Sequence, residues 1–173
     1  MNLLDHLVSE HREAESLIDK IADTDPGPER TRLLDELAEA LHTHMKVEEQ
    51  FLYPLAREVL SDDDEVEEGN NEHETAREVL DRMYEIKDEP GFAGALDMLK
   101  AGLVHHHGDE EEDLFPVLRE KAGDRIDRLD PEKLEEFVGL TREELYDKAQ
   151  AAGVEGRSDM TRDELSRALA EDG

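Results

Sequence analysis

The sequence has no cysteine and no tryptophan, and aromatic side chains make up only 4% of its 173 residues. Without cysteine the chain can form no disulfide, no thiolate-ligated metal site and no cysteine-held iron–sulfur cluster. Basic residues are also scarce, with 20 Lys and Arg against 49 Asp and Glu, for a formal net charge of −29. Such a charge disfavours binding to nucleic acid or to an anionic membrane, because the phosphate groups would be repelled.

Long apolar runs are missing as well. No run approaches the roughly 20 residues that a membrane-spanning helix needs. The opening residues, MNLLDHLVSEHREAE, contain neither the basic nor the apolar region of a signal peptide. We therefore expect a cytoplasmic protein that has no contact with membranes. The length favours one main domain with a small appendage.

Four segments carry apolar residues at alternating spacings of three and four, which is the pattern of a helix that buries one face. They cover residues 2–22, residues 29–60, the stretch between the acidic run 61–65 and Pro90, and residues 92–121. The connections between them are short and contain proline, glycine or acidic residues. The sequence thus predicts an all-α fold in which residues 1–121 form an up-down-up-down four-helix bundle.

Polar residues on these stripes repeat at an offset of 62 residues. The repeated pairs are His11 and His73, His44 and His106, Glu48 and Glu110, and Pro54 and Pro116. In each half, a lone histidine is followed by a His-x3-Glu motif, whose spacing places both side chains on one helix face. A hydrophobic core needs only apolar residues to recur, so a repeat of His and Glu indicates a shared metal site.

A set of hydrogen-bonded core histidines is the plainer alternative. It would have to bury two carboxylates as well, and an unpaired buried carboxylate costs several kcal/mol. Imidazole and carboxylate ligands without thiolate suit iron, manganese or zinc. Four histidines and two carboxylates suit two ions better than one. We expect two iron ions, with manganese or zinc less favoured.

The order His, His-x3-Glu, His, His-x3-Glu resembles the hemerythrin-like, or HHE cation-binding, domain family over about residues 1–121. The flanking segments 44-HMKVEEQFLYP-54 and 106-HHGDEEEDLFP-116 strengthen the likeness. The resemblance implies a four-helix bundle with a non-haem di-iron centre, bridged by oxo or hydroxo and by two carboxylates. It also implies that His11, His44, His73 and His106 are terminal ligands, and that Glu48 and Glu110 are the bridges.

Two departures from the family's oxygen carriers bear on function. Those carriers have a fifth histidine four residues after the third, where this chain has Arg77, and an aspartate where it has Glu111. Fewer protein ligands leave more open positions on each ion, which favours activation chemistry over oxygen storage. We expect peroxide turnover, as in catalase-like relatives of this type, with Glu111 or Asp113 moving the proton.

The alternative is a protein that binds or senses O2, NO or iron without turnover, so the sequence leaves open whether this is an enzyme. A purely structural metal site is a third and weaker reading. Tyr53 is interpreted as a packing residue close to the site, with a ligand or a hydrogen-bond donor beside the ligands as the alternative. His6, His42, His105 and His107 point away from the stripes, and we expect them at the surface.

Residues 122–133 are polar and are interpreted as a linker, and residues 134–173 as a small separate module. Thr141 with Glu144, and Thr161 with Glu164, are capping-box starts for two short helices joined by an extended turn. This helix–extended loop–helix pattern resembles SAP-like modules and the helical N-terminal domain of the transcription terminator Rho. Such modules often bind nucleic acid, but the acidic surplus here favours binding to a protein or packing on the bundle.

Overall fold

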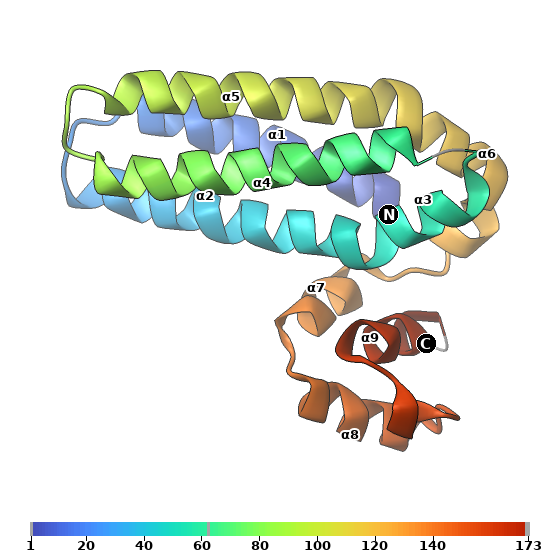
Figure 1. Cartoon of the computed structure of the whole chain (residues 1–173). Helices are drawn as coiled ribbons and strands as arrows, with labels where there is room; N and C mark the ends of the chain where they lie inside the picture. Colours follow the sequence, from blue (N-terminus) through green and yellow to red (C-terminus); the bar gives the residue numbers. More distant parts are fainter. Residues whose placement is uncertain (1, 62, 172–173) are drawn as a thin grey trace.

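The computed structural model describes residues 2–61 and 63–171, and within these ranges the chain is helical with no strands. Four long helices lie side by side and form the predicted bundle (Figure 1). They are α1 (Leu3–Ala22), α2 (Pro28–Val47), α4 (Asp64–Glu85) and α5 (Phe92–Asp109). The predicted fold class, a helical bundle followed by a small helical module, is confirmed. Within the described residues, no helix is long and apolar enough to cross a membrane.

Two of the predicted helices are interrupted by a widened turn. After α2 comes the π-helical segment η1 (Glu48–Leu52) and then α3 (Tyr53–Val59); after α5 come η2 (Glu110–Leu114) and α6 (Phe115–Ile126). The amide of Tyr53 donates to the carbonyl of Glu48 five residues back. Pro54 and Pro116 follow directly, and a proline ring clashes with the carbonyl four residues earlier in an α-helix. A π-turn relieves this clash, and such turns are frequent at functional sites.

The apolar core is divided into two clusters. One joins the halves of the four helices near the α1–α2 and α4–α5 connections and includes Ile21, Leu34, Met83 and Leu96. The other lies at the opposite end and includes Leu4, Leu52 and Phe115. A layer of buried polar side chains separates the two clusters along the bundle.

The C-terminal residues fold beside one end of the bundle (Figure 1). They form α7 (Pro131–Gly139), α8 (Arg142–Ala152), the short η3 (Arg157–Asp159) and α9 (Arg162–Glu171). The Thr141–Glu144 capping box forms at the start of α8, as the sequence predicts. Leu134, Phe137, Leu145 and Leu165 belong to the same apolar cluster as Leu3 and Phe51 of the bundle. The tail therefore shares its core with the bundle.

Candidate metal centre

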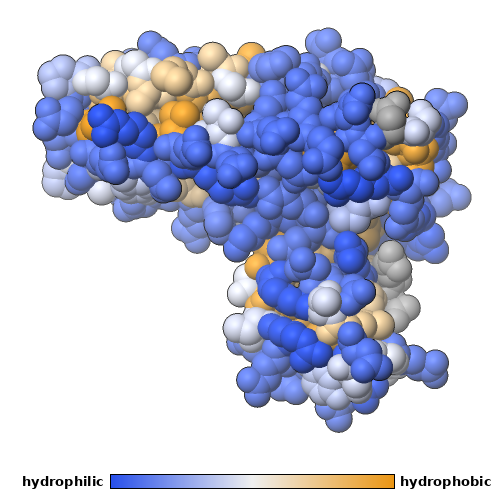
Figure 2. Space-filling view, viewed as in Figure 1, coloured by the Kyte–Doolittle hydropathy of each residue, from blue (hydrophilic) through white to orange (hydrophobic). Residues whose placement is uncertain are grey.

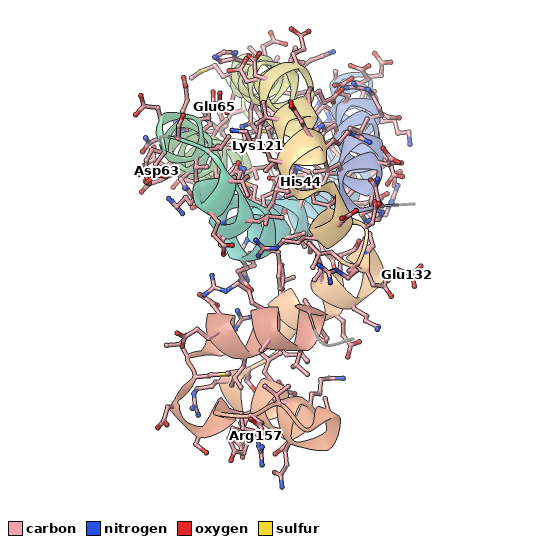
Figure 3. All side chains as sticks on the ribbon, turned by 90° about the vertical axis from the view of Figure 1, so that its right-hand side faces the viewer. His44, Asp63, Glu65, Lys121, Glu132 and Arg157 are labelled. Atoms are coloured by element: carbon pink, nitrogen blue, oxygen red, sulfur yellow. The ribbon has the colours of Figure 1, made fainter. Side chains whose placement is uncertain are left out.

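The polar layer between the two apolar clusters contains all six repeated His and Glu residues. Each has at most 4% of its surface exposed: His11, His44, Glu48, His73, His106 and Glu110. They come from α1, α2 with η1, α4, and α5 with η2, so each of the four long helical segments contributes at least one of them. Viewed along the bundle, His44 lies in the space enclosed by the helices (Figure 3). The structure therefore brings these six residues together in one buried layer.

The layer divides into two groups whose ligand atoms are close enough to hold a metal ion. One group is His11, His44, Glu48 and Glu110, and the other is Glu48, His73 and His106. Glu48 belongs to both groups, since its Oε1 lies 3.2 Å from Nε2 of His44 and its Oε2 lies 3.2 Å from Nε2 of His73. Glu110 lies between the groups as well, with its Oε2 3.5 Å from Nε2 of His11 and 3.8 Å from Nε2 of His106.

The outward nitrogen of each histidine is held by a glutamate of its own. Nδ1 of His11 donates to Glu111 over 2.8 Å, and Nδ1 of His73 donates to Glu49 over 3.0 Å. Likewise, His44 donates to Glu10 over 3.0 Å and His106 to Glu72 over 2.9 Å. These four glutamates obey the same 62-residue offset as the histidines. A carboxylate on Nδ1 fixes the ring so that Nε2 points inward, an arrangement typical of metal-binding histidines.

The buried histidines and carboxylates of the layer shift one another's pKa values toward their charged forms. Burial opposes protonation of His44, but the carboxylates of Glu48 and Glu10 outweigh it and raise the pKa of His44 well above its usual value. The pKa of His106 rises to about 9 despite burial, because Glu48 and Glu110 are close. Burial would raise the pKa of Glu48, but the surrounding histidines lower it well below the usual value.

The donor atoms that face inward fit a metal better than they fit one another. Within the described residues, Nε2 of His11, Nε2 of His44, both carboxylate oxygens of Glu48 and Oε2 of Glu110 are buried without a hydrogen-bond partner. Buried polar atoms in native proteins are normally paired, so such a cluster requires an explanation. Divalent cations would satisfy all of these atoms and cancel the negative charge.

The two halves differ at Tyr53. Its hydroxyl donates to Oε1 of Glu110 over 3.2 Å and lies 3.3 Å from Nε2 of His73. At the equivalent positions of the other half, Phe115 corresponds to Tyr53 and Leu7 corresponds to Gly69. A Cβ atom on Gly69 would lie only 2.5 Å from the Tyr53 hydroxyl oxygen. Gly69 therefore provides the room that the extra hydroxyl needs, and Tyr53 is a polar member of the site rather than only a packing residue.

The expectation that His107 lies at the surface is wrong. His107 is 2% exposed, and its ring is stacked on that of His11 with centroids 3.8 Å apart and planes inclined by 5°. Burial, together with His11 and His44, lowers the pKa of His107 strongly. The repeat could have revealed this position, because His107 corresponds to Met45, which is also buried. His42 and His105 are exposed as expected, whereas His6 is half-buried.

His107, His11 and His44 form a third group of close nitrogens, but the stacking argues against His107 as a ligand. A ligated ion lies in the plane of its imidazole, and two nearly parallel stacked planes share no point at bonding distance. We expect His107→Met, which copies Met45, to keep the parent's metal content by elemental analysis. Both His107 nitrogens are unpartnered, so urea unfolding should show apo-protein stability raised by about 1–3 kcal/mol. A lost ion would instead identify His107 as a ligand.

A family model for the hemerythrin HHE cation-binding domain matches residues 2–93. The chain belongs to this family. The matched span contains His11, His44, Glu48 and His73, and the 62-residue repeat extends the same pattern to His106 and Glu110. No curated protein and no solved structure matched the chain. The protein is thus hemerythrin-like, with His and Glu groups that can hold a metal in the middle of its bundle.

Proposed function

We propose that this hemerythrin-like protein holds two iron ions in the polar layer and turns over hydrogen peroxide. One observation supports the paired site above all: Glu48 belongs to two separate groups of buried ligands, with one carboxylate oxygen turned toward each. An iron pair supplies a two-electron redox couple, which disproportionation of two H2O2 to O2 and two H2O requires. Four histidines and two carboxylates leave coordination positions open for a small ligand.

The protein's own residues orient the site and limit what reaches it. The four glutamates on the Nδ1 atoms hold the histidine rings in place, and the apolar clusters on both sides exclude bulk water. Of the two candidates for proton transfer, Glu111 is already engaged by His11 and Arg12. Asp113 is exposed and lines a cavity that reaches Glu110. We therefore favour Asp113 as the group that moves the proton between solvent and the site.

Two cavities between α4 and α5 reach the layer. One, of about 160 Å³, ends at Tyr53, His106 and Glu110. The other, of about 180 Å³, ends at His73 and His106 and has mostly apolar walls that include Met98 and Leu99. Apolar residues gather over this part of an otherwise hydrophilic face (Figure 2). A small neutral molecule such as peroxide, O2 or NO fits these dimensions.

The proposal is tested with iron-loaded protein and an oxygen electrode. We expect O2 release from peroxide over many turnovers per chain, and Asp113→Asn should lower kcat while leaving the iron content unchanged. Glu112→Gln, which changes an exposed neighbour, serves as the control. Release of less than one O2 per iron pair would rule out peroxide turnover.

A binding or sensing protein without turnover is the second candidate, and a contact of the tail favours it. Arg162 of α9 donates to the side-chain oxygen of Gln50 in η1 over 3.0 Å, and also to the carbonyl of Val138 at the end of α7. The segment that begins with Glu48 is thus tied to the tail. A stable NO adduct that changes the protease sensitivity of the tail, without peroxide turnover, would support this function. The likeness of the tail to SAP and Rho modules stays a prediction.

A further inference from the structure

The cavity beside Tyr53 is lined at its mouth by acidic side chains. Glu65, Glu68, Glu72, Asp109 and Asp113 surround it, and its inner end is formed by His106, Glu110 and Tyr53. Glu110 is 4% exposed, and within the described residues its Oε2 atom is buried without a hydrogen-bond partner. Glu110, whose Oε2 is buried without a partner, thus lies at the inner end of a passage whose outer walls are negative. Glu65 lies in the first turn of α4 and is labelled in Figure 3.

The repeat shows what the same place looks like in the other half. The equivalent cleft, between α1 and α2, has Leu3, Leu7, Val47 and Phe51 where the open cleft has Glu65, Gly69, Asp109 and Asp113. All four apolar side chains are at most 4% exposed. One half of the repeated bundle is therefore filled with apolar residues at these positions, and the other carries three acidic residues and a glycine.

The tail covers the plugged half. Leu3, Leu7, Val47 and Phe51 share their apolar cluster with Leu134 and Phe137 of α7. His6, which corresponds to Glu68, contacts Glu135 of α7, with 2.5 Å between Nε2 and Oε1. The tail and the plug together close the α1–α2 side, whereas in the open half Glu65, Glu68, Asp109 and Asp113 are exposed.

We propose that the acidic cleft between α4 and α5 is the passage through which divalent cations reach the metal centre. Glu68 and Glu72 of its wall have ligand atoms within 4.8 Å of one another and of His105, and these three residues form an outer holding site. Glu72 connects this site to the centre, because its carboxylate accepts a hydrogen bond from His106. The loading route depends only on metal binding and is independent of the reaction proposed above.

The negative charge of this cleft and its carboxylate ligands favour a cation over other occupants. Carboxylates on low-dielectric walls focus a negative potential, which raises the local concentration of cations and speeds their association by roughly 10- to 1,000-fold. The same potential repels anions. Carboxylate oxygens with one imidazole suit divalent first-row metals, and exposed ligands release such ions easily enough to pass them inward.

Loading of the full-length apoprotein with cobalt(II), followed by stopped-flow absorption, tests the proposal. The cleft variant is Glu65→Gln with Glu68→Gln and Asp109→Asn. The matched control, Glu13→Gln with Glu39→Gln and Asp81→Asn, removes the same charge from exposed positions elsewhere. We expect the cleft variant to load about tenfold more slowly than the control, with a weaker dependence on ionic strength and the same final cobalt content.

Equal loading rates in the cleft and control variants would overturn the proposal. A second variant closes the cleft sterically: Tyr53→Phe with Gly69→Leu rebuilds the Phe115–Leu7 pair of the other half. Slower loading of this variant to the parent's cobalt content supports the passage, and an unchanged rate contradicts it. Peroxide turnover can fail while loading follows these expectations, so the two proposals are separable.

Discussion

Replacing Glu48 with glutamine is expected to remove paired metal binding, leaving about one ion per chain or none. The amide keeps the shape of the side chain but loses the charge and one of the two oxygens that face different histidine groups. Glu48 is the residue common to both groups and lies 3.2 Å from a histidine of each, whereas Glu110 reaches His106 only over 3.8 Å. Elemental analysis after loading with excess metal, together with calorimetric titration, measures the effect.

Glu111→Gln is the matched control for this substitution. Glu111 accepts a hydrogen bond from Nδ1 of His11, on the outside of the layer. It belongs to neither group of possible metal ligands. Its loss should weaken metal affinity by about 10- to 100-fold while keeping the number of ions. If Glu48→Gln binds as many ions as the parent with similar affinity, Glu48 is not shared between two ions.

Opposite pH dependences are expected for the apoprotein and the metal-bound protein. In the apoprotein, the pKa values of His44, His73 and His106 are raised, that of His106 to about 9, from a usual value of 6.5. The protonated rings stabilise the fold below pH 6.5, and this stabilisation is lost as the pH rises toward 9. Metal ions need the neutral rings, so metal affinity should increase about tenfold per pH unit for each proton released.

Urea unfolding between pH 6 and pH 9, with chelator or with cobalt(II), measures both trends. The unfolding midpoint of the apoprotein should fall across this range, while the midpoint with metal should rise relative to it. A mutant that lacks Glu48 should lose most of the apoprotein's pH dependence, because Glu48 contributes to all three raised pKa values. An apoprotein whose stability rises from pH 6.5 to 9 would contradict the assigned protonation of the layer.

The residues of the candidate metal centre can be selected from the sequence because the same chemistry occurs twice. The offset of 62 residues selects His11 with His73 and Glu48 with Glu110, and helical spacing of four residues puts His44 beside Glu48. The structure brings these residues together, and the family match agrees with the cation-binding character. The identity of the metal and its reaction stay predictions, because imidazole and carboxylate ligands accept several ions.

Other features depend on packing that spacing alone does not reveal. The π-turns at Glu48 and Glu110 shift the register of each helix, so a uniform helical period misplaces residues near them. Glu10, Glu49 and Glu72 look like part of the solvated acidic surface in the sequence, although together with Glu111 they follow the 62-residue offset. The spacing in the sequence does not reveal that His107 is buried. Successive residues differ by about 100° around a helix axis, so His107 points away from His106 and can still face the inside of the bundle. Here it turns toward His11.

Metal content per chain tests whether the polar layer holds an iron pair. Elemental analysis with an absorption spectrum should be run on the parent and on His44→Ala with His106→Ala. The account predicts close to two iron ions per parent chain, with iron charge-transfer absorption that the double variant loses. One zinc ion or no metal in the parent, with a double variant that folds equally well, would contradict the iron pair and leave a helical binding protein.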